Sequence, residues 1–316
     1  DGIFARYVEA GGNFIDTANF YGGFGGSETV LGQAVKGRRN RLVIASKYTL
    51  TMAPGDPNAS GNQRKNMVQS VEASLKRLGT DYLDLFYLHV WDCRTPVEEV
   101  LRAFDDLVRA GKILYVGISD TPAWQISRMQ AIAELRGWSP LVALQIPYSL
   151  AERTVEREYM PMAREMGLGV LPWSPLAGGV LTGKYSRADL HAQGSAPMSA
   201  IRDRKSMNLA TGRLNEQALA IAEVVKQVAA ELAVSPAQVA LAWTLLNPAV
   251  VSPIIGARTF DQLQDNLGAL EISFTDDQAM RLNEVSQVEQ SFPHYMLEGE
   301  LAKGMLGGVE VERRQR

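Results

Sequence analysis

The sequence predicts an α/β fold, a closed (β/α)8 barrel, and a single domain over residues 1–316. Short apolar runs alternate with longer stretches of helical periodicity, and this alternation predicts a parallel sheet covered by helices. Most of the runs are continuously apolar, as are strands buried on both faces. A polar residue or a glycine marks the end of each run. A barrel collects all these ends at one mouth, whereas an open doubly wound sheet spreads them along an edge, so we favour the barrel.

Seven strands are predicted, in chain order Asn13–Asp16, Leu42–Ser46, Tyr82–Leu88, Tyr115–Ser119, Val142–Pro147, Gly169–Trp173 and Val251–Ile255. Their C-terminal ends are marked by Asp16, Lys47, His89, Ser119, Gln145, Ser174 and Gly256. A helical pattern at Ile3–Val8 precedes the first strand. A barrel needs one more strand before that helix, and we expect this first strand to be missing from the chain.

The helices between the strands have clear start and stop signals. Val68–Leu78 keeps one apolar face, and Gly79 is expected to end that helix. Four other helices are predicted to begin with a capping box, in which Ser or Thr is followed three positions later by Glu or Gln. The capping residues are Thr95, Ser235, Thr259 and Thr275.

Two segments do not fit the repeating strand and helix unit. Residues 177–213 are rich in Gly, Ser and Arg and are too long for a simple turn. Long loops at a barrel mouth are typically functional lids or disordered. Residues 275–316 are predicted to form C-terminal helices and a tail.

Composition excludes several classes of function. The chain has 316 residues, of which 46% are hydrophobic, and a formal net charge of −3, which argues against a nucleic-acid partner. No apolar stretch approaches the roughly 20 residues of a membrane span, and there is no signal peptide. Cys93 is the single cysteine, so no intrachain disulfide can form. We expect a cytoplasmic protein without membrane partners, and its oligomeric state stays open.

Four of the polar side chains suggest a site of proton transfer. Asp16 could be the partner that compensates the charge of Lys47 at the end of a buried strand. Tyr21 lies five positions after Asp16 in a glycine-rich loop, and a nearby ammonium would lower its pKa. His89 completes the group. Each has a structural alternative, respectively a salt bridge, a rim aromatic and a hydrogen-bonded core histidine. Only three histidines occur, without ligand spacing, so no metal site is predicted.

Two further segments have features of anion sites. Gly178–Lys184 matches the P-loop pattern, but Tyr185 stands where a magnesium-binding Ser or Thr is needed. An NTP site is therefore disfavoured, and Lys184 is left as a simple charge for a phosphate. Arg258 precedes the helix capped by Thr259, an arrangement that suits an anion. The alternative is an ordinary capped helix with polar surface residues.

Several stretches, in this order and spacing, resemble the aldo-keto reductases, including the subgroup of potassium-channel β-subunits and bacterial reductases. They are Gly12–Ala18, Ala45–Lys47, Asp84–His89, Gly117–Ser119, Gln145–Ser149, Trp173–Leu176 and Pro253–Ala257. The resemblance covers nearly the whole chain. It implies NADPH bound across the barrel mouth, under the 177–213 loop, and reduction of a small aldehyde or ketone substrate.

The resemblance also assigns roles residue by residue. The catalytic set would be Asp16, Tyr21, Lys47 and His89, with Tyr21 as the general acid, its pKa lowered by Lys47. Residues that would contact the nicotinamide are Ser119, Gln145 and Trp173. Those that would bind the pyrophosphate are Ser174, Leu176, Gly178 and Lys184, with Arg202 or Arg204 as weaker candidates. Those at the adenosine end would be Gly256, Arg258, Gln262, Asp265 and Asn266.

Two positions depart from the pattern, and two other functions stay open. Asp120 stands where many members have Asn, and Gln262 where many have an arginine for the 2′-phosphate. Arg258 would compensate, which implies NADPH in preference to NADH. The alternatives are a cofactor-sensing subunit with little turnover and an aldolase-type lyase that forms a Schiff base through Lys47.

Overall fold

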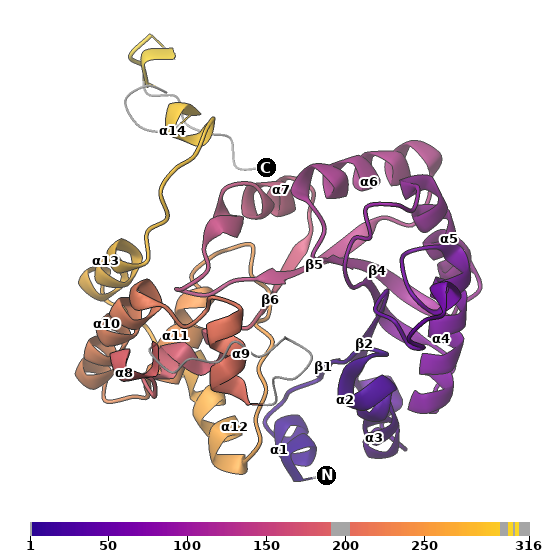
Figure 1. Cartoon of the computed structure of the whole chain (residues 1–316), viewed down its shortest axis with the longest axis horizontal. Coiled ribbons are helices and arrows are strands. Elements are labelled where there is room, and N and C mark those ends of the chain that lie inside the picture. Colours follow the sequence, from indigo (N-terminus) through magenta and orange to yellow (C-terminus); the bar gives the residue numbers. More distant parts are fainter. Residues whose placement is uncertain (1, 191–202, 298–302, 306, 310–316) are drawn as a thin grey trace. The chain divides into compact units, whose positions relative to one another are not determined.

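The computed structural model describes residues 2–190, 203–297, 303–305 and 307–309. Its sheet has six strands that neighbour one another in chain order, and the first five pair with one another in parallel (Figure 1). The strands are β1 (Phe14–Asp16), β2 (Val43–Tyr48), β3 (Leu83–Leu88), β4 (Ile113–Ser119), β5 (Leu141–Pro147) and β6 (Gly169–Trp173). Sequential parallel strands alternating with helices are the arrangement of a (β/α)8 barrel, so the predicted fold class is confirmed.

The predicted strand at Val251–Ile255 is reduced to an isolated parallel bridge. Val250 bridges Val170, and the Val251 amide donates to the Val170 carbonyl at 2.9 Å. The next donor along a ladder would be residue 253, which is a proline and has no N–H. The segment therefore runs beside β6 without forming a regular strand.

The chain divides into two compact units. The first contains Asp1–Ile146, Met166–Trp173 and Pro248–Gly268, and the second contains Pro147–Glu165, Ser174–Asn247 and Ala269–Arg316. Helices of the first unit are α1 (Gly2–Glu9), α2 (Tyr21–Phe24), α3 (Gly26–Ala34), α4 (Arg64–Leu78), α5 (Val97–Arg109), α6 (Ala123–Arg136) and α12 (Phe260–Leu267). Helices of the second are α7 (Tyr159–Glu165), α8 (Arg187–Leu190), α9 (Arg204–Ala210), α10 (Glu216–Leu232), α11 (Pro236–Thr244), α13 (Asp276–Val285) and α14 (His294–Leu297). The single-domain organisation stays a prediction.

The segment expected to be a long loop is partly helical. It contains the 3-10 segment η4 (Ala177–Thr182) as well as α8 and α9. Residues 191–202, which include the candidate Arg202, lie outside the described residues. The predicted covering role of this segment stays a prediction.

Most of the predicted helix boundaries are confirmed. Gly79 ends α4 with a left-handed φ of 65°, and Ser235, Thr259 and Thr275 cap their helices through the side chain. Thr95 is the exception. Its hydroxyl donates to Asp92 at 2.6 Å, and α5 begins after Pro96 without a side-chain cap.

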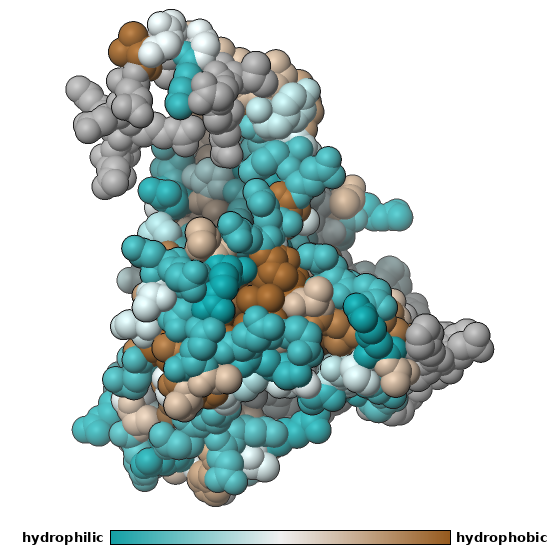
Figure 2. Space-filling view, turned by 90° about the vertical axis from the view of Figure 1, so that its left-hand side faces the viewer, coloured by the Kyte–Doolittle hydropathy of each residue, from teal (hydrophilic) through white to brown (hydrophobic). Residues whose placement is uncertain are grey.

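Hydrophilic side chains cover most of the face shown in Figure 2. Among the described residues, no helix combines the length and apolar character needed to cross a membrane.

The inner face of the sheet carries a hydrophobic cluster that positions the polar strand ends. The cluster is formed by Ala45, Leu85, Tyr87, Ala143 and Leu171. Residues two positions apart on a strand share a face. The polar or aromatic residues two positions beyond Ala45, Tyr87, Ala143 and Leu171 are Lys47, His89, Gln145 and Trp173. The sheet therefore directs all four toward the side of the inner cluster.

Candidate active site

A buried ion pair joins the ends of β1 and β2. The register places Asp16 beside Ala45, two residues before Lys47. Lys47 Nζ lies 2.5 Å from Asp16 Oδ2 and 2.8 Å from the Thr17 carbonyl oxygen. The Lys47 side chain is 0% exposed, and that of Asp16 is 9% exposed. A buried ammonium requires such partners, because an uncompensated buried charge is strongly destabilising.

Tyr21 and His89 adjoin this ion pair. The Tyr21 hydroxyl lies 3.4 Å from His89 Nε2, and the two rings meet edge to face at 5.6 Å. Lys47 Nζ lies 4.9 Å from the centroid of the Tyr21 ring. The chain can turn tightly after Tyr21 because Gly22 has a φ of 70°, and a Cβ there would lie 2.7 Å from the Ser27 amide nitrogen. The structure thus brings together the four side chains singled out from the sequence.

The pKa of Tyr21 differs in direction from the expectation. Burial raises this pKa above its ordinary value, and the charges of Asp16 and Asp120 add to the effect. The expected net lowering is therefore wrong for this structure, because burial and the two carboxylates outweigh any stabilisation of the phenolate by Lys47. The ammonium is hydrogen-bonded to Asp16 and to the Thr17 carbonyl, so its field at the phenol is offset by a neighbouring carboxylate. Tyr21 is consequently protonated at neutral pH.

His89 is neutral at the same pH. Burial and the charge of Lys47 lower its pKa from 6.5 to about 4. Its Nδ1 atom is buried and has no hydrogen-bond partner in the described part of the chain. A neutral imidazole can donate from one nitrogen only, so it acts on a neighbour as a hydrogen-bonding group and not as a cation.

The low pKa of His89 predicts a pH-dependent stability. Because the unfolded chain binds this proton more readily, the free energy of unfolding must fall as pH decreases from 6.5 toward 4. Between pH 7.5 and 4.5 we expect wild type to lose about 2–3 kcal/mol more than His89→Gln does. Urea unfolding at several pH values measures this difference, with His294→Gln as the control. Equal losses in wild type and His89→Gln would contradict the assignment.

Two candidate nicotinamide contacts are held by acidic residues of the same unit. Gln145 Nε2 donates to Asp16 Oδ1 at 2.9 Å, so Asp16 contacts Lys47 with one oxygen and Gln145 with the other. Trp173 Nε1 donates to Asp120 Oδ1 at 3.0 Å. Each bond fixes the orientation of the side chain that donates it. Ser119, at the end of β4, is buried.

Sequence reasoning missed two acceptors in this group. The Thr17 carbonyl, which binds Lys47, is a backbone atom and has no signal in the residue types. Glu28, fully buried, accepts from Ser46 at 2.5 Å and pairs with Arg77 at 2.6 Å beneath β2. An acid three positions into a helix resembles a surface residue, and only its burial distinguishes it.

The second unit contains a tight glycine turn that packs against Asn208 and Lys184. Gly178 and Gly179 have φ values of 65° and 89°, and Cβ atoms there would meet Asn208 Oδ1 at 2.2 Å and Lys184 Nζ at 2.8 Å. Asn208 Oδ1 is buried and unpartnered among the described residues. Successive backbone amides in left-handed turns form anion-binding concavities. Lys184 Nζ lies close to this turn, whereas the Asn208 carbonyl oxygen beside Gly178 would repel an anion, so binding of the pyrophosphate here stays a prediction. Ser174 and Leu176 precede the turn, and Arg204 begins α9.

The candidate adenosine contacts of the first unit lie before α12 and along it. The Arg258 amide donates to Gln262 Oε1 at 2.9 Å, and Thr259 caps the helix through the Gln262 amide. Gln262 thus has a structural role. Arg258 is exposed, Asp265 is half-buried and Asn266 is buried. A Cβ at Gly256 would meet nothing within 4 Å. No group of His, Cys, Asp or Glu that could hold a metal occurs in the described ranges.

Comparison with known proteins gives consistent matches. The model of the Aldo/keto reductase family matches residues 2–287. Norsolorinic acid reductase stcV of Emericella nidulans is 37% identical over 295 residues, which cover 91% of this chain and 72% of the relative. The uncharacterized oxidoreductase YrpG of Bacillus subtilis is 38% identical, covering 90% of this chain and 85% of the relative. Aryl-alcohol dehydrogenase [NADP(+)] of Phanerodontia chrysosporium is 34% identical, covering 93% of this chain and 77% of the relative.

Proposed function

The chain belongs to the aldo/keto reductase family of oxidoreductases, and from this premise we propose that it reduces an aldehyde or ketone to an alcohol with NADPH. One observation carries the proposal, namely a protonated phenol 3.4 Å from a neutral imidazole and beside a buried ammonium–carboxylate pair. The relative named for NADP(+) and aryl alcohol supports both the cofactor and an aromatic carbonyl as substrate. Phe20 and Phe24, both exposed, meet edge to face at 5.6 Å on either side of Tyr21 in the sequence, which suits an aromatic substrate.

Each residue of the site has a distinct part in the reaction. When bound, the nicotinamide supplies a hydride to the carbonyl carbon. Tyr21 donates its hydroxyl proton to the carbonyl oxygen, and its raised pKa keeps that proton in place at neutral pH. The phenolate left by this donation is stabilised by the Lys47 ammonium, which Asp16 holds in position. His89 orients the carbonyl oxygen beside the Tyr21 hydroxyl by hydrogen bonding.

The remaining candidate residues would hold the cofactor. Trp173 presents a ring for the nicotinamide, and the set that would contact the carboxamide is Ser119 and Gln145. The pyrophosphate would be held by Ser174, Leu176, Gly178, Lys184 and Arg204. The adenosine end would be held by Gly256, Arg258, Gln262, Asp265 and Asn266. The Lys184 ammonium, which lies close to Gly179, supports the phosphate part of this assignment.

The 2′-phosphate assignment predicts a selective loss of affinity. Arg258→Ala removes a charged donor, so NADPH binding should weaken about 10- to 100-fold while NADH binding changes little. Titration of each cofactor with quenching of protein fluorescence measures both affinities. Arg136→Ala, an exposed arginine at the end of α6, is the charge-matched control. An equal loss for NADPH and NADH would contradict the assignment.

Steady-state kinetics test the function itself. We expect NADPH oxidation that depends on an aromatic aldehyde such as 4-nitrobenzaldehyde. Tight NADPH binding without turnover would instead favour a cofactor-sensing subunit. Borohydride trapping of a carbonyl compound on Lys47 would favour the Schiff-base lyase. The lyase is disfavoured by geometry, because the Lys47 side chain is 0% exposed and its Nζ contacts Asp16 and Thr17.

A further inference from the structure

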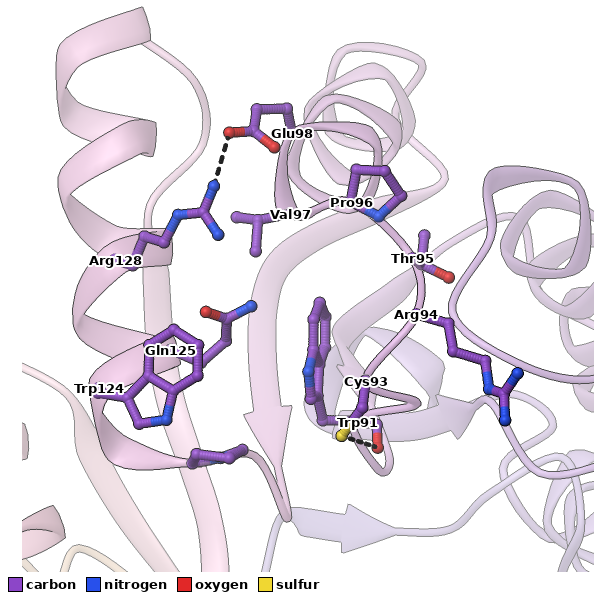
Figure 3. A pocket seen from close by; sticks show the side chains of 11 residues that line it. Trp91, Cys93, Arg94, Thr95, Pro96, Val97, Glu98, Trp124, Gln125 and Arg128 are labelled. Atoms are coloured by element: carbon purple, nitrogen blue, oxygen red, sulfur yellow. Dashed lines mark hydrogen bonds and ion pairs between the residues drawn. The ribbon is translucent and has the colours of Figure 1, made fainter.

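The segment that follows β3 carries His89 and borders open space. Trp91, two residues after His89, lines a cavity of about 350 Å³. Figure 3 shows the Trp91 ring standing between α6 and the residues that lead into α5. Because the segment borders a cavity on this side, close packing contributes less to fixing its conformation there. Its backbone hydrogen bonds therefore decide where His89 and Trp91 are held, and one buried side chain makes several of them.

That side chain belongs to Asn62, which is 0% exposed and lies just before α4. Its Nδ2 atom donates to the Val90 carbonyl at 3.0 Å, and its Oδ1 atom accepts from the Asp92 amide at 2.7 Å. The Asn62 amide thus bonds to the backbone on both sides of Trp91. In return, Asp92 Oδ2 accepts from the backbone amide of Asn62 at 2.8 Å. A buried polar group satisfied in this way holds the segments that it joins in one conformation.

The same side chain reaches the segment that follows β2. Asn62 Nδ2 also donates to Thr49 Oγ1 at 2.9 Å, and that oxygen accepts from the His89 amide at 3.3 Å. The His89 amide shares this contact with the Tyr48 carbonyl, which lies at 3.2 Å. Thr49 follows Lys47 by two residues. The contact therefore joins the two segments that carry the buried ammonium and the imidazole. We call the bonds from the Asn62 side chain to Thr49, Val90 and Asp92 the Asn62 clamp.

Thr49 is held in a backbone conformation that threonine rarely adopts. Its φ is 109°, and a β-branched residue at positive φ is a conformational outlier. Such strain persists only where surrounding contacts impose it, and it is concentrated at functional sites. Here the contacts are those of Oγ1 and of the Thr49 carbonyl, which accepts from the Gly61 amide at 2.8 Å. The turn before α4 thus keeps the Thr49 hydroxyl directed at the His89 amide.

We propose that Asn62 is a positioning residue, which acts through Thr49 and the backbone of residues 90–92 to hold His89 beside Tyr21. The inference rests on the proposed function, because the place of His89 matters to the reaction only if its imidazole orients a carbonyl oxygen. Without the clamp, His89 can leave its position 3.4 Å from the Tyr21 hydroxyl. A displacement of about 1 Å at a reacting centre can cost about 10²-fold in rate.

Hydrogen exchange of the purified full chain tests the clamp without any turnover. Asn62→Leu keeps a side chain of similar size and removes its hydrogen bonds, so the amides of residues 89–95 should exchange about tenfold faster. Asn66→Leu is the control. It removes another buried amide from the same turn, one that donates to the Gly61 carbonyl at 2.8 Å, and should leave residues 89–95 unchanged. Unchanged exchange over 89–95 in Asn62→Leu overturns the proposal, whether or not the chain is a reductase.

A double-mutant cycle in kcat/KM tests whether the effect passes through His89. Asn62→Leu should lower kcat/KM for 4-nitrobenzaldehyde about 10- to 100-fold and leave NADPH affinity unchanged. In His89→Gln, which already lacks the imidazole, the same substitution should cost less than about threefold. Equal losses in the two backgrounds would indicate a purely structural role and overturn the proposal. If wild type has no turnover while Asn62→Leu exchanges faster, the proposed function is refuted and the clamp is confirmed.

Thr49 offers a milder pair of variants in case Asn62→Leu does not fold. Thr49→Val removes the hydroxyl, but both donors that lose it keep a second acceptor, the carbonyl of Tyr48 or of Val90. The chain should therefore fold, with kcat/KM lowered about threefold to tenfold. Thr49→Ser restores the acceptor and should recover most of this loss. Wild-type activity in Thr49→Val, or no recovery in Thr49→Ser, refutes the positioning role.

Discussion

Replacing Tyr21 with Phe is expected to abolish carbonyl reduction while NADPH binding persists. The variant keeps the ring that meets His89 edge to face and lies 4.9 Å from Lys47 Nζ, and it removes only the hydroxyl. General acid catalysis contributes about 10²–10⁴-fold, so kcat should fall by at least that factor. The measurement is aldehyde-dependent NADPH oxidation, accompanied by fluorescence titration of the cofactor.

Tyr82→Phe is the matched control, because it removes a tyrosine hydroxyl whose contact among the described residues is a 3.5 Å hydrogen bond to Asn40, at the other end of β3. It should leave kcat unchanged. Turnover by Tyr21→Phe at the wild-type rate would remove Tyr21 from the mechanism, and a loss of cofactor binding would show that the hydroxyl has a structural role instead.

Lys47→Met is the second variant with a large expected effect, and it should reduce both activity and stability. The substitution leaves the 9% exposed Asp16 carboxylate without its cation. Breaking a buried ion pair from one side costs about 3–5 kcal/mol, and the free energy of unfolding should fall by that amount. The phenolate of Tyr21 loses its stabilising charge in the same variant, so kcat should also fall by at least about 10²-fold.

A double-mutant cycle separates the two effects of Lys47→Met. Asp16→Asn alone leaves the ammonium unpaired and should be destabilising as well. The double variant, Asp16→Asn with Lys47→Met, buries no charge at this position. Its loss in free energy of unfolding should therefore be smaller than the sum of the two single losses. Its activity should stay low, because the cation is still absent. Additive stability losses in the cycle would refute an energetic coupling between Asp16 and Lys47.

The placement of the site residues was predictable where it depended on strand register. Lys47, His89 and Gln145 follow buried strand residues by two positions, and a period of two is legible in the sequence. The absence of a regular strand at Val251–Ile255 was harder to predict. The run is continuously apolar, which favours a strand, and this concealed that Pro253 has no N–H to donate to a neighbouring strand. Thr95 was misassigned because its hydroxyl donates to Asp92, three residues earlier, and does not accept from a helix amide.

The electrostatics of the site were not predictable from residue types. A lysine near a tyrosine suggests a lowered phenol pKa, yet burial and the carboxylates of Asp16 and Asp120 raise it. The net direction of the pKa shift depends on which neighbouring charges are already hydrogen-bonded and on how far each group is exposed to water. Both are properties of packing, and the sequence reports neither.

Asp16 divides its two oxygens between Lys47 on β2 and Gln145 on β5. One carboxylate thereby contacts residues of two strands, β2 and β5, that lie three strands apart in the order of the sheet. Residues that share a partner in this way have epistatic effects. Attempts to re-engineer nicotinamide contacts at Gln145 will therefore alter the proton-donating side of the site too, and the two properties have to be optimised together.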